Sequence, residues 1–232
     1  MRLVRMNKPM NHKKVLRLMN KYGLHCPIRQ ANPYRRMAKA LKTNTIAPNH
    51  LNREFRSRGP RKVLLTDISY IRINDGFIYL SVIKDAYTMQ VLAYELSDSL
   101  EVDFVLATIK QMLQKYWCSL GAETIIHSDQ GCHYTSVAFR QLLNDSNLRQ
   151  SMSRRGNCWD NAPQESFFGH MKDELKPYAK EWKSYLDVKT RIDDWMDYYN
   201  NERYQTILGG MSPNEYYNYL VTNEKPSALT KK

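Results

Sequence analysis

The sequence predicts an α/β fold in which helices cover a layer of β-strands. Three strand-like segments come first, and a helix, a strand, a helix, a strand and a further helix follow in that order. Such an alternation is typical of a layered α/β domain. The chain has 232 residues, of which 42% are hydrophobic, so it has enough apolar material for one medium-sized domain with a core and one smaller element.

The first three strands are predicted for residues 63–72, 76–84 and 89–96, where apolar residues dominate. An Asn-Asp-Gly run at 74–76 is a strong signal for a tight hairpin turn, because these residues tolerate the backbone angles that such turns need. We therefore expect the first two strands to form a hairpin.

The next elements continue the alternation. A helix is predicted for about 101–117, with Ser99 as its cap and a row of apolar side chains on one face. A strand at 123–128, a helix near 136–146 and a short strand near 148–152 follow. These segments complete the predicted sheet.

A further helix should begin near Ala162. Asn161 or Asp160 can cap it, and Pro163 suits its first turn. An apolar stripe on this helix should pack on the sheet. A polar stripe runs beside it at steps of three and four residues and consists of Asn161, Glu165, Gly169, Lys172 and Lys176.

The C-terminal part is predicted to be helical. A capping-box pattern at Ser184 starts one helix, and Ser212 with Pro213 starts a last short one. No internal repeat is present in the sequence. We expect five parts along the chain, namely a helical remnant at 1–23, a flexible basic linker at 24–62, the core at 63–178, a helical extension at 179–220 and a tail at 221–232.

Charge is distributed unevenly along the chain. Residues 1–62 contain 17 Lys and Arg and one acid, a net +16, whereas residues 63–232 contain 18 Lys and Arg and 22 acids, a net −4. This asymmetry points to a polyanionic partner bound mainly through the N-terminal arm. A basic tail that only aids solubility is the alternative. Within the arm, residues 11–22 are predicted to form a short amphipathic helix, capped by Asn11 and ended by Gly23.

Cysteine usage and hydropathy exclude two classes of protein. The four cysteines, at positions 26, 118, 132 and 158, lack the spacing of a zinc module, and reduced thiols are the default. No apolar run approaches the ~18 residues that a membrane span needs. We therefore expect an intracellular, soluble protein without a membrane partner.

Three acidic residues stand in contexts that differ from those of an ordinary surface charge. Asp67 lies inside an apolar run, Asp129 ends another, and Glu165 falls in the first turn of the helix predicted from Ala162. A carboxylate within a buried strand is costly unless it is paired or binds a metal ion. Three such groups suit a site for a divalent cation with oxygen ligands. Four other acids are expected to be solvated surface charges: Asp85, Asp98, Asp103 and Asp145.

Short motifs surround these three acids. They read DISYI at 67–71, HSDQG at 127–131 and DNAPQESFF at 160–168, with 35 residues between Asp129 and Glu165. In this order and spacing they resemble the DDE integrase core, and most closely the OrfB-type transposases of the IS-three insertion-sequence family. YNNERYQ at 199–205 and LGGMSP at 208–213 resemble that family's C-terminal motif. The resemblance covers about the last three-quarters of the chain.

The resemblance implies a fold and a set of ligands. The fold is ribonuclease H-like, a mixed five-stranded sheet flanked by helices. Asp67 would bridge two Mg²⁺ ions, and Asp129 and Glu165 would each hold one, with Mn²⁺ able to substitute. The family places a Lys or Arg seven residues after its Glu, which corresponds to Lys172 and implies contact with a DNA phosphate. A solvated lysine on the helix face is the alternative.

Other residues have two interpretations each. Arg154 and Arg155 could clamp DNA phosphate or be a solvated pair, and Arg203 belongs to the C-terminal motif. His127 shares a strand face with Asp129, so it could orient a metal-bound water or be a satisfied core histidine. Three aromatic residues could stack on bases but are more often core residues, namely Tyr134, Trp159 and Phe167.

The function implied by the resemblance is metal-dependent cleavage and strand transfer of DNA by a transposase. Its partners would be the ends of an insertion sequence, target DNA, further copies of the chain and possibly the product of an upstream reading frame, in the bacterial cytoplasm at the nucleoid. The chain departs from the family pattern at His133 and Gln205. It also starts too late for a complete helix-turn-helix region, so we expect an N-terminal truncation. The alternative function is a catalytically silent, DNA-binding inhibitor of transposition.

Overall fold

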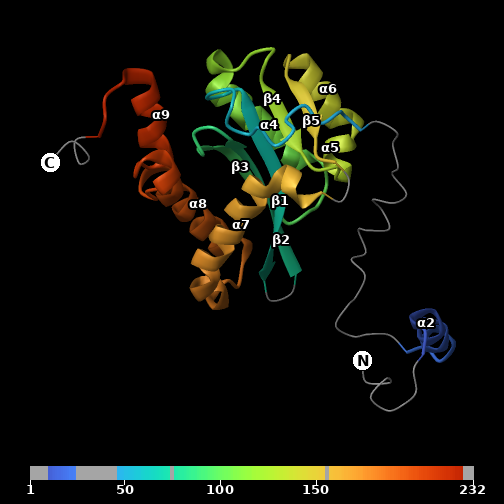
Figure 1. The fold of residues 1–232 in the computed structure, drawn as a ribbon. Coiled ribbons are helices and arrows are strands. Elements are labelled where there is room, and N and C mark those ends of the chain that lie inside the picture. The colour runs from blue at the N-terminus through green and yellow to red at the C-terminus, as the bar shows by residue number, and fades with distance from the viewer. Residues whose placement is uncertain (1–9, 25–45, 74–75, 155–156, 227–232) are drawn as a thin grey trace. The chain divides into compact units, whose positions relative to one another are not determined.

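The structure is a computed structural model that describes residues 10–24, 46–73, 76–154 and 157–226 (Figure 1). The chain divides into two units, Met1–Lys42 and Thr43–Lys232. The second unit contains the whole sheet and the helices that surround it.

The sheet has five strands in the order β3-β2-β1-β4-β5. The pairs β1–β2 and β2–β3 are antiparallel, whereas β1–β4 and β4–β5 are parallel. The prediction of a mixed five-stranded sheet is therefore confirmed, and so is the pairing of the first two strands. The strands are β1 (Val63–Ile73), β2 (Gly76–Asp85), β3 (Val91–Ser97), β4 (Ile125–Ser128) and β5 (Arg149–Met152).

Helices flank the sheet, as predicted. The helices of the second unit are α4 (Asp103–Tyr116), α5 (Cys132–Thr135), α6 (Val137–Asp145), α7 (Ala162–Leu175), α8 (Tyr185–Asn201) and α9 (Pro213–Thr222). Short 3-10 helices occur at Trp117–Ser119, Cys158–Asn161, Lys176–Glu181 and Thr206–Leu208. The four-residue α5 was not predicted, because a single turn leaves no periodic pattern in the sequence.

Two apolar clusters hold the layers together, one on each face of the sheet. Leu80 and Val82 of β2 pack with residues of α7 and α8. Leu64 of β1 and Ile83 of β2 pack with residues of α4, α5 and α6. Neighbouring residues of a strand point to opposite faces, so this alternation lets one strand contribute to both clusters. In Figure 1, α7 lies across the strands, and α8 and α9 continue from it.

Caps at the helix ends follow the sequence in some cases and not in others. Ser184 forms the predicted capping box, and Ser212 starts the last helix as predicted and also forms a capping box. Ser99 does not cap α4, which begins at Asp103 after Val102 and has no side-chain cap. The Ser99 backbone N–H instead bonds the Ser97 hydroxyl at 3.0 Å. Ser99 lies three residues before the cap position, too far back for its hydroxyl to serve as the cap.

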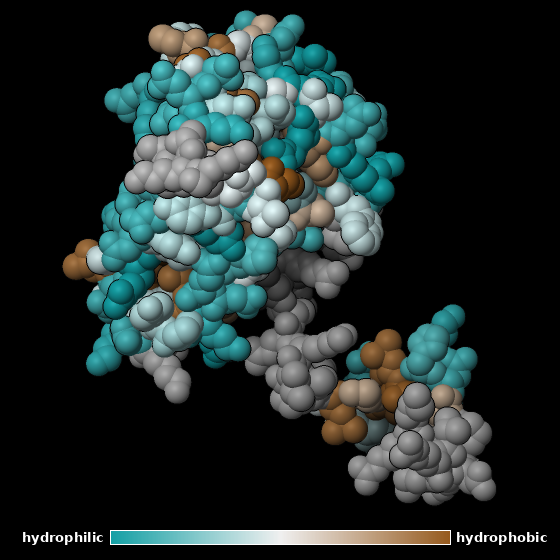
Figure 2. Space-filling model, turned by 60° about the vertical axis from the view of Figure 1, so that its left-hand side comes forward, coloured by the Kyte–Doolittle hydropathy of each residue, from teal (hydrophilic) through white to brown (hydrophobic). Residues whose placement is uncertain are grey.

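The N-terminal unit contains α2 (His12–Lys21). Its cap is the predicted one, since the Asn11 side chain accepts a bond from the Lys13 N–H at 2.9 Å, and the chain turns at Gly23 with a φ of 62°. No residue of α2 is buried, and Leu16 is 58% exposed. The brown side chains of this unit in Figure 2 contrast with the largely hydrophilic surface of the second unit in the same view.

The predicted linker at 24–62 needs a correction. Of this stretch, the structure describes residue 24 and residues 46–62. We call residues 46–61 the strap. Leu51 of the strap is 1% exposed and packs with Val63, Leu65 and Ile125 in a third apolar cluster. The strap is therefore part of the folded core, and the predicted boundary at residue 62 is wrong.

Asp85 also differs from the expectation of a solvated charge. Its side chain is fully buried at the end of β2, and Arg61 of the strap pairs with it at 2.8 Å. The backbone N–H groups of Arg61 and Tyr87 donate to the same carboxylate at 2.9 and 2.8 Å. Asp85 is thus a satisfied structural carboxylate that joins the strap to β2.

Candidate active site

The candidate site begins where β1 and β4 run side by side. The two strands are parallel, and Leu65 pairs with His127. Two residues further along each chain are Asp67, in the middle of β1, and Asp129, just after β4 ends. Side chains two residues apart share a face of the sheet, so this register brings the two carboxylates to one level on one face.

The helix α7 brings the third acid to this face. Glu165 lies in the first turn of α7, and the Asn161 side chain donates to the Asp67 carboxylate at 3.2 Å. This bond ties the start of α7 to β1. Asn161 occupies the cap position of α7 but forms no side-chain cap bond, so its predicted role as a cap is wrong.

The three acids interact electrostatically, as the carboxyl group of Asp67 shows. The pKa of Asp67 is raised to about 7, mainly by removal from water and in addition by the nearby charges of Asp129 and Glu165. The ammonium group of Lys172 and a bond from the Ile68 N–H oppose this rise. The charges of Asp129, Glu165 and Lys172 therefore all act on the carboxyl group of Asp67.

Asp129 is held by the turn that follows it. Desolvation by surrounding protein atoms raises the pKa of the Asp129 carboxyl group, although part of the residue is exposed to solvent. The Gly131 N–H donates to its carboxylate at 2.9 Å. A Cβ atom at Gly131 would lie 2.9 Å from that same oxygen, so any side chain there would displace the carboxylate. Gly131 is thus required by close approach rather than by an unusual backbone angle.

The donor set fits a hard divalent cation. Oxygen ligands are what Mg²⁺ prefers, and neither Asp67 nor Asp129 forms a salt bridge among the residues described. Within the described ranges, however, no group of three or more His, Cys, Asp or Glu side chains is arranged to hold an ion. Glu165 is exposed, so it is the member of the set that has freedom to adjust.

Lys84 of β2 bonds the first turn of α7, and it was not identified from the sequence. Its side chain is almost fully buried, its ammonium nitrogen donates to the Pro163 carbonyl at 2.7 Å, and it lies 4.8 Å from the centre of the Phe167 ring. Burial lowers the pKa of Lys84 to about 7. The signal in the sequence was a lysine inside an otherwise apolar strand, where a charge needs a partner.

His127 is a core histidine, the second of its two interpretations. The residue is fully buried, and its ring nitrogens bond the hydroxyl groups of Ser151 at 2.9 Å and Ser153 at 3.2 Å. Its Nε2 also donates to the Asp160 carbonyl at 2.9 Å. Burial lowers the pKa of His127, which favours the neutral ring. His127 therefore braces the segment before α7.

Two of the three arginines predicted to bind DNA, Arg154 and Arg203, have intramolecular partners. The Arg154 guanidinium makes two bonds with the buried Asp160, at 2.8 and 2.9 Å, and remains about half exposed. Arg155 lies outside the described residues. Arg203 pairs with Glu174 of α7 at 2.9 Å, and Trp195 donates to the same carboxylate at 2.8 Å. Arg203 thus holds the chain after α8 against α7.

Of the aromatic residues considered for base stacking, two are core residues. Tyr134 is 1% exposed and Phe167 is 4% exposed, so neither is accessible to a base. Trp159 is 67% exposed, just before α7. Only Trp159 keeps the interpretation of a residue that could stack on DNA.

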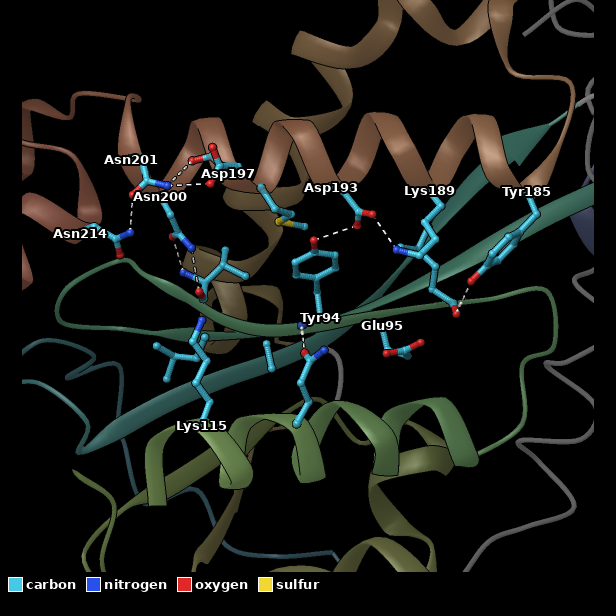
Figure 3. A pocket seen from close by; sticks show the side chains of 16 residues that line it. Tyr94, Glu95, Lys115, Tyr185, Lys189, Asp193, Asp197, Asn200, Asn201 and Asn214 are labelled. Atoms are coloured by element: carbon cyan, nitrogen blue, oxygen red, sulfur yellow. Dashed lines mark hydrogen bonds and ion pairs between the residues drawn. The ribbon is translucent and has the colours of Figure 1, made fainter. Parts of the chain in front are cut away.

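A pocket of about 410 Å³ lies elsewhere, along β3 between α4 and α8 (Figure 3). None of the three acids lines it. The strand β3 is at the edge of the sheet, and side chains bond its backbone. Asn200 bonds both the N–H and the carbonyl of Val91 at 2.9 Å, and Gln111 accepts from the Tyr94 N–H at 3.1 Å. Polar side chains thus line a closed strand edge at this pocket.

No helix in the described part of the chain is both long and apolar enough to span a membrane.

Comparison with known families and proteins places these features in context. Two models described as "Integrase core domain" match residues 57–158 and 146–213. An uncharacterized transposase-like protein of Haemophilus influenzae is 36% identical over 208 residues, which are 89% of this chain and 92% of that protein. The putative transposase InsK for insertion sequence element IS150 of Escherichia coli is 33% identical over 93% of this chain and 74% of its own length.

Solved structures show the same fold at low sequence identity. The catalytic core domain of BIV integrase has a TM-score of 0.54 at 18% identity, over 70% of this chain and 98% of that one. The HTLV-2 integrase catalytic core domain, solved in complex with magnesium, has a TM-score of 0.53 at 16% identity, over 70% and 99%. These likenesses confirm the predicted ribonuclease H-like fold.

Proposed function

The chain belongs to the integrase-core family of insertion-sequence transposases, and from this premise we propose that it catalyses metal-dependent cleavage and strand transfer of DNA. The observation that carries this proposal is the state of Asp67. It is a carboxylate with no salt bridge among the described residues, and its pKa is raised by its surroundings and by two further acids. Such a group gains most from a bound cation.

We propose that Asp67, Asp129 and Glu165 are the catalytic residues and hold two Mg²⁺ ions, for which Mn²⁺ substitutes. When bound, the ions would activate the attacking oxygen and stabilise the charge on the leaving oxygen. Asp67 would contact both ions, and Asp129 and Glu165 one each. Glu165 would move inward from its exposed position. Asn161 orients the Asp67 carboxylate through their bond.

The reaction takes place in two displacements at phosphorus. In the first, water attacks the phosphate at the end of the element, the bond to the 3′-oxygen breaks, and a 3′-hydroxyl group is released. In the second, that hydroxyl attacks a phosphate of the target DNA, the bond from this phosphorus to the 3′-oxygen of the target strand breaks, and the element end is joined to the 5′-phosphate of the target. Lys172, which interacts with Asp67, would neutralise a phosphate near the bond that breaks.

The wider context is part of the same proposal. The family would be the IS-three type with an OrfB-type chain. The substrates would be the ends of its own element and target DNA, and further copies of the chain would assemble on that DNA in the bacterial cytoplasm. Residues 1–62, with a net charge of +16, would supply most of the sequence-independent affinity for DNA. Arg154 and Arg155 would add a smaller basic contact near α7.

The test uses duplex DNA that carries the terminal sequences flanking the gene. We expect cleavage and joining with Mg²⁺ or Mn²⁺, no product with excess chelator, and no product with Asp129→Asn, which keeps the shape of the side chain but removes its charge. Asp98→Asn is the matched control, because Asp98 is an exposed acid outside the site. Full activity of Asp129→Asn would contradict the mechanism. DNA binding by the wild-type chain without any cleavage would favour the silent inhibitor.

A further inference from the structure

The strap crosses the segment that leads into α7. The backbone N–H of His50 donates to the Ser151 hydroxyl of β5 at 2.9 Å, and the Met152 N–H donates to the Pro48 carbonyl at 3.4 Å. Further along, the side chains of Asn49 and Arg53 each donate to Asp160 at 3.0 Å. Residues more than a hundred positions apart in the sequence are thereby joined just before the helix that carries Glu165.

Asp160 is the centre of this junction. Its side chain is fully buried and accepts five hydrogen bonds. Two come from the strap, and three come from the backbone and guanidinium of Arg154. These bonds keep the pKa of the Asp160 carboxyl well below its usual range. Because the Asp160 carbonyl also accepts from His127, the residue is fixed at both its side chain and its backbone.

The position of Asp160 determines where α7 begins. Asn161 follows it directly and bonds Asp67, and α7 starts at Ala162. Glu165 is in the first turn, only five residues after Asp160. A movement of Asp160 would therefore displace both the bond that orients Asp67 and the carboxylate of Glu165. Displacements of about 1 Å in a catalytic group are enough to lower a rate about a hundredfold.

We propose that the strap supports the active site. Its residues Arg53 and Asn49 are positioning residues that hold the start of α7 in place through their bonds to Asp160. The inference rests on the proposed function for the role of Glu165, but the ordering of α7 by the strap does not. Arg53 does not touch the reacting atoms. Its charge faces solvent on one side, with 48% of the side chain exposed, and Asp160 on the other.

The chain offers a closely matched control. Lys62 directly follows the strap, its side chain is 44% exposed, and it forms one ion pair, with Glu123 at 2.9 Å. Lys62→Ala and Arg53→Ala therefore remove one cation of similar exposure from the same region. They differ in the partner, because Glu123 is 82% exposed, whereas the side chain of Asp160 is fully buried. A difference between the two variants reports the junction at Asp160 rather than the loss of a positive charge.

The first measurement is hydrogen exchange of the full chain without DNA or metal. We expect Arg53→Ala to speed exchange of the amides at 166–169, the first N–H groups of α7 that bond a carbonyl within the helix, about three- to tenfold, since a bond to a buried charge is lost. Lys62→Ala should leave them unchanged, and α8 should be unchanged in both variants. Equal exchange of 166–169 in wild type and Arg53→Ala would overturn the proposal, and so would equally faster exchange in both variants.

The second measurement is the single-turnover rate of strand transfer at saturating DNA, together with DNA affinity. Arg53→Ala should lower the rate about tenfold and weaken DNA binding no more than Lys62→Ala does. Arg53→Lys, which keeps a cation within reach of Asp160, should recover most of the rate. Equal rates for the two alanine variants would overturn the catalytic role of the strap. An inactive wild-type chain that still shows the exchange effect would contradict the proposed function and leave the ordering of α7 supported.

Discussion

Asp67 and Asp160 are two carboxylates connected through Asn161, which follows Asp160 in the chain and bonds Asp67. Their surroundings shift their pKa values in opposite directions. The Asp160 carboxylate accepts five hydrogen bonds and pairs with two arginines, Arg53 and Arg154, and its pKa lies well below the usual range. Asp67 receives bonds from one backbone N–H and one amide group, faces two further acids, and has a pKa raised to about 7. Removal from water opposes ionisation at both residues, so their partners make the difference.

The contrast separates structural from functional charge. A carboxylate that must hold the fold together is given its cations by the chain itself, as Asp160 and Asp85 are. Asp67, the proposed ligand of an ion from solution, has no such cation partner among the described residues. The sites of perturbed ionisation in a protein are therefore good candidates for function, provided that structural ion pairs are recognised first.

The largest expected effect tests the functional side of this contrast. Asp67→Asn should lower strand-transfer activity at least about a thousandfold, because the proposed metal site would lose one ligand charge. The same change should raise the melting temperature at pH 8 without metal, since it removes repulsion with Asp129 and Glu165. Calorimetry of both proteins checks the second outcome. A lower melting temperature of the variant would contradict the contrast between Asp67 and Asp160.

The pH dependence of the stability increase expected for Asp67→Asn follows from the raised pKa of Asp67. Between about pH 4 and 7 the folded protein binds the proton more tightly than the unfolded chain, so ionisation destabilises the fold progressively as the pH rises to 7. The stabilising effect of Asp67→Asn should therefore be full above pH 7 and should fade as the pH falls towards 4. Millimolar Mg²⁺ should stabilise the wild-type protein and not the variant.

The next effect tests the structural side. Arg61→Met should destabilise the fold by about 3–5 kcal/mol, because it leaves the buried carboxylate of Asp85 without its cation. Urea unfolding measures this loss. Lys62→Met is the control, since its pair with Glu123 is exposed, and it should cost less than about 1 kcal/mol. Similar losses in both variants would mean that Asp85 does not depend on Arg61.

A smaller effect concerns Lys84, a buried cation without a carboxylate partner among the described residues. Because burial lowers its pKa to about 7 from 10.5, the unfolded chain binds more protons between these values, and stability should rise with pH in this window. Lys84→Met should remove this rise, which is about 1.4 kcal/mol per pH unit for one proton. Unfolding of both proteins at pH 7, 8 and 9 checks it, and parallel curves would contradict the lowered pKa.

The smallest effect concerns Arg203. Its pair with Glu174 is partly exposed, so Arg203→Ala should destabilise the fold by about 1 kcal/mol. Because the guanidinium is bonded within the protein, DNA affinity should fall less than in Lys172→Ala. DNA titrations of the two variants at one salt concentration measure the difference. A larger loss of affinity for Arg203→Ala would make Arg203 a DNA contact, as its motif suggested.

The sequence predicted most of the sheet because strand patterns and the Asn-Asp-Gly turn are local. The same is true of the capping box at Ser184 and of the helix start at Ser212. The candidate site residues were identified from short motifs and their spacing, which can be read from a single sequence. Charge partners could not be predicted in this way, since Arg53 and Asp160 lie 107 residues apart and Arg61 and Asp85 lie 24 apart. Asp85 and the strap were misjudged for this reason, because charge and composition alone do not reveal a distant partner.

The closed edge of β3 has a consequence for crowding. A free edge strand presents a row of unpaired backbone groups that invites another chain to add to the sheet, which is a common start of aggregation. Here Asn200 occupies both backbone groups of Val91, Gln111 takes the Tyr94 N–H, and the Tyr185 hydroxyl donates to the Leu96 carbonyl at 2.9 Å (Figure 3). Copies of the chain held close together would therefore find fewer free backbone groups on β3 than on a bare edge strand, which disfavours strand-to-strand pairing at this edge of the sheet.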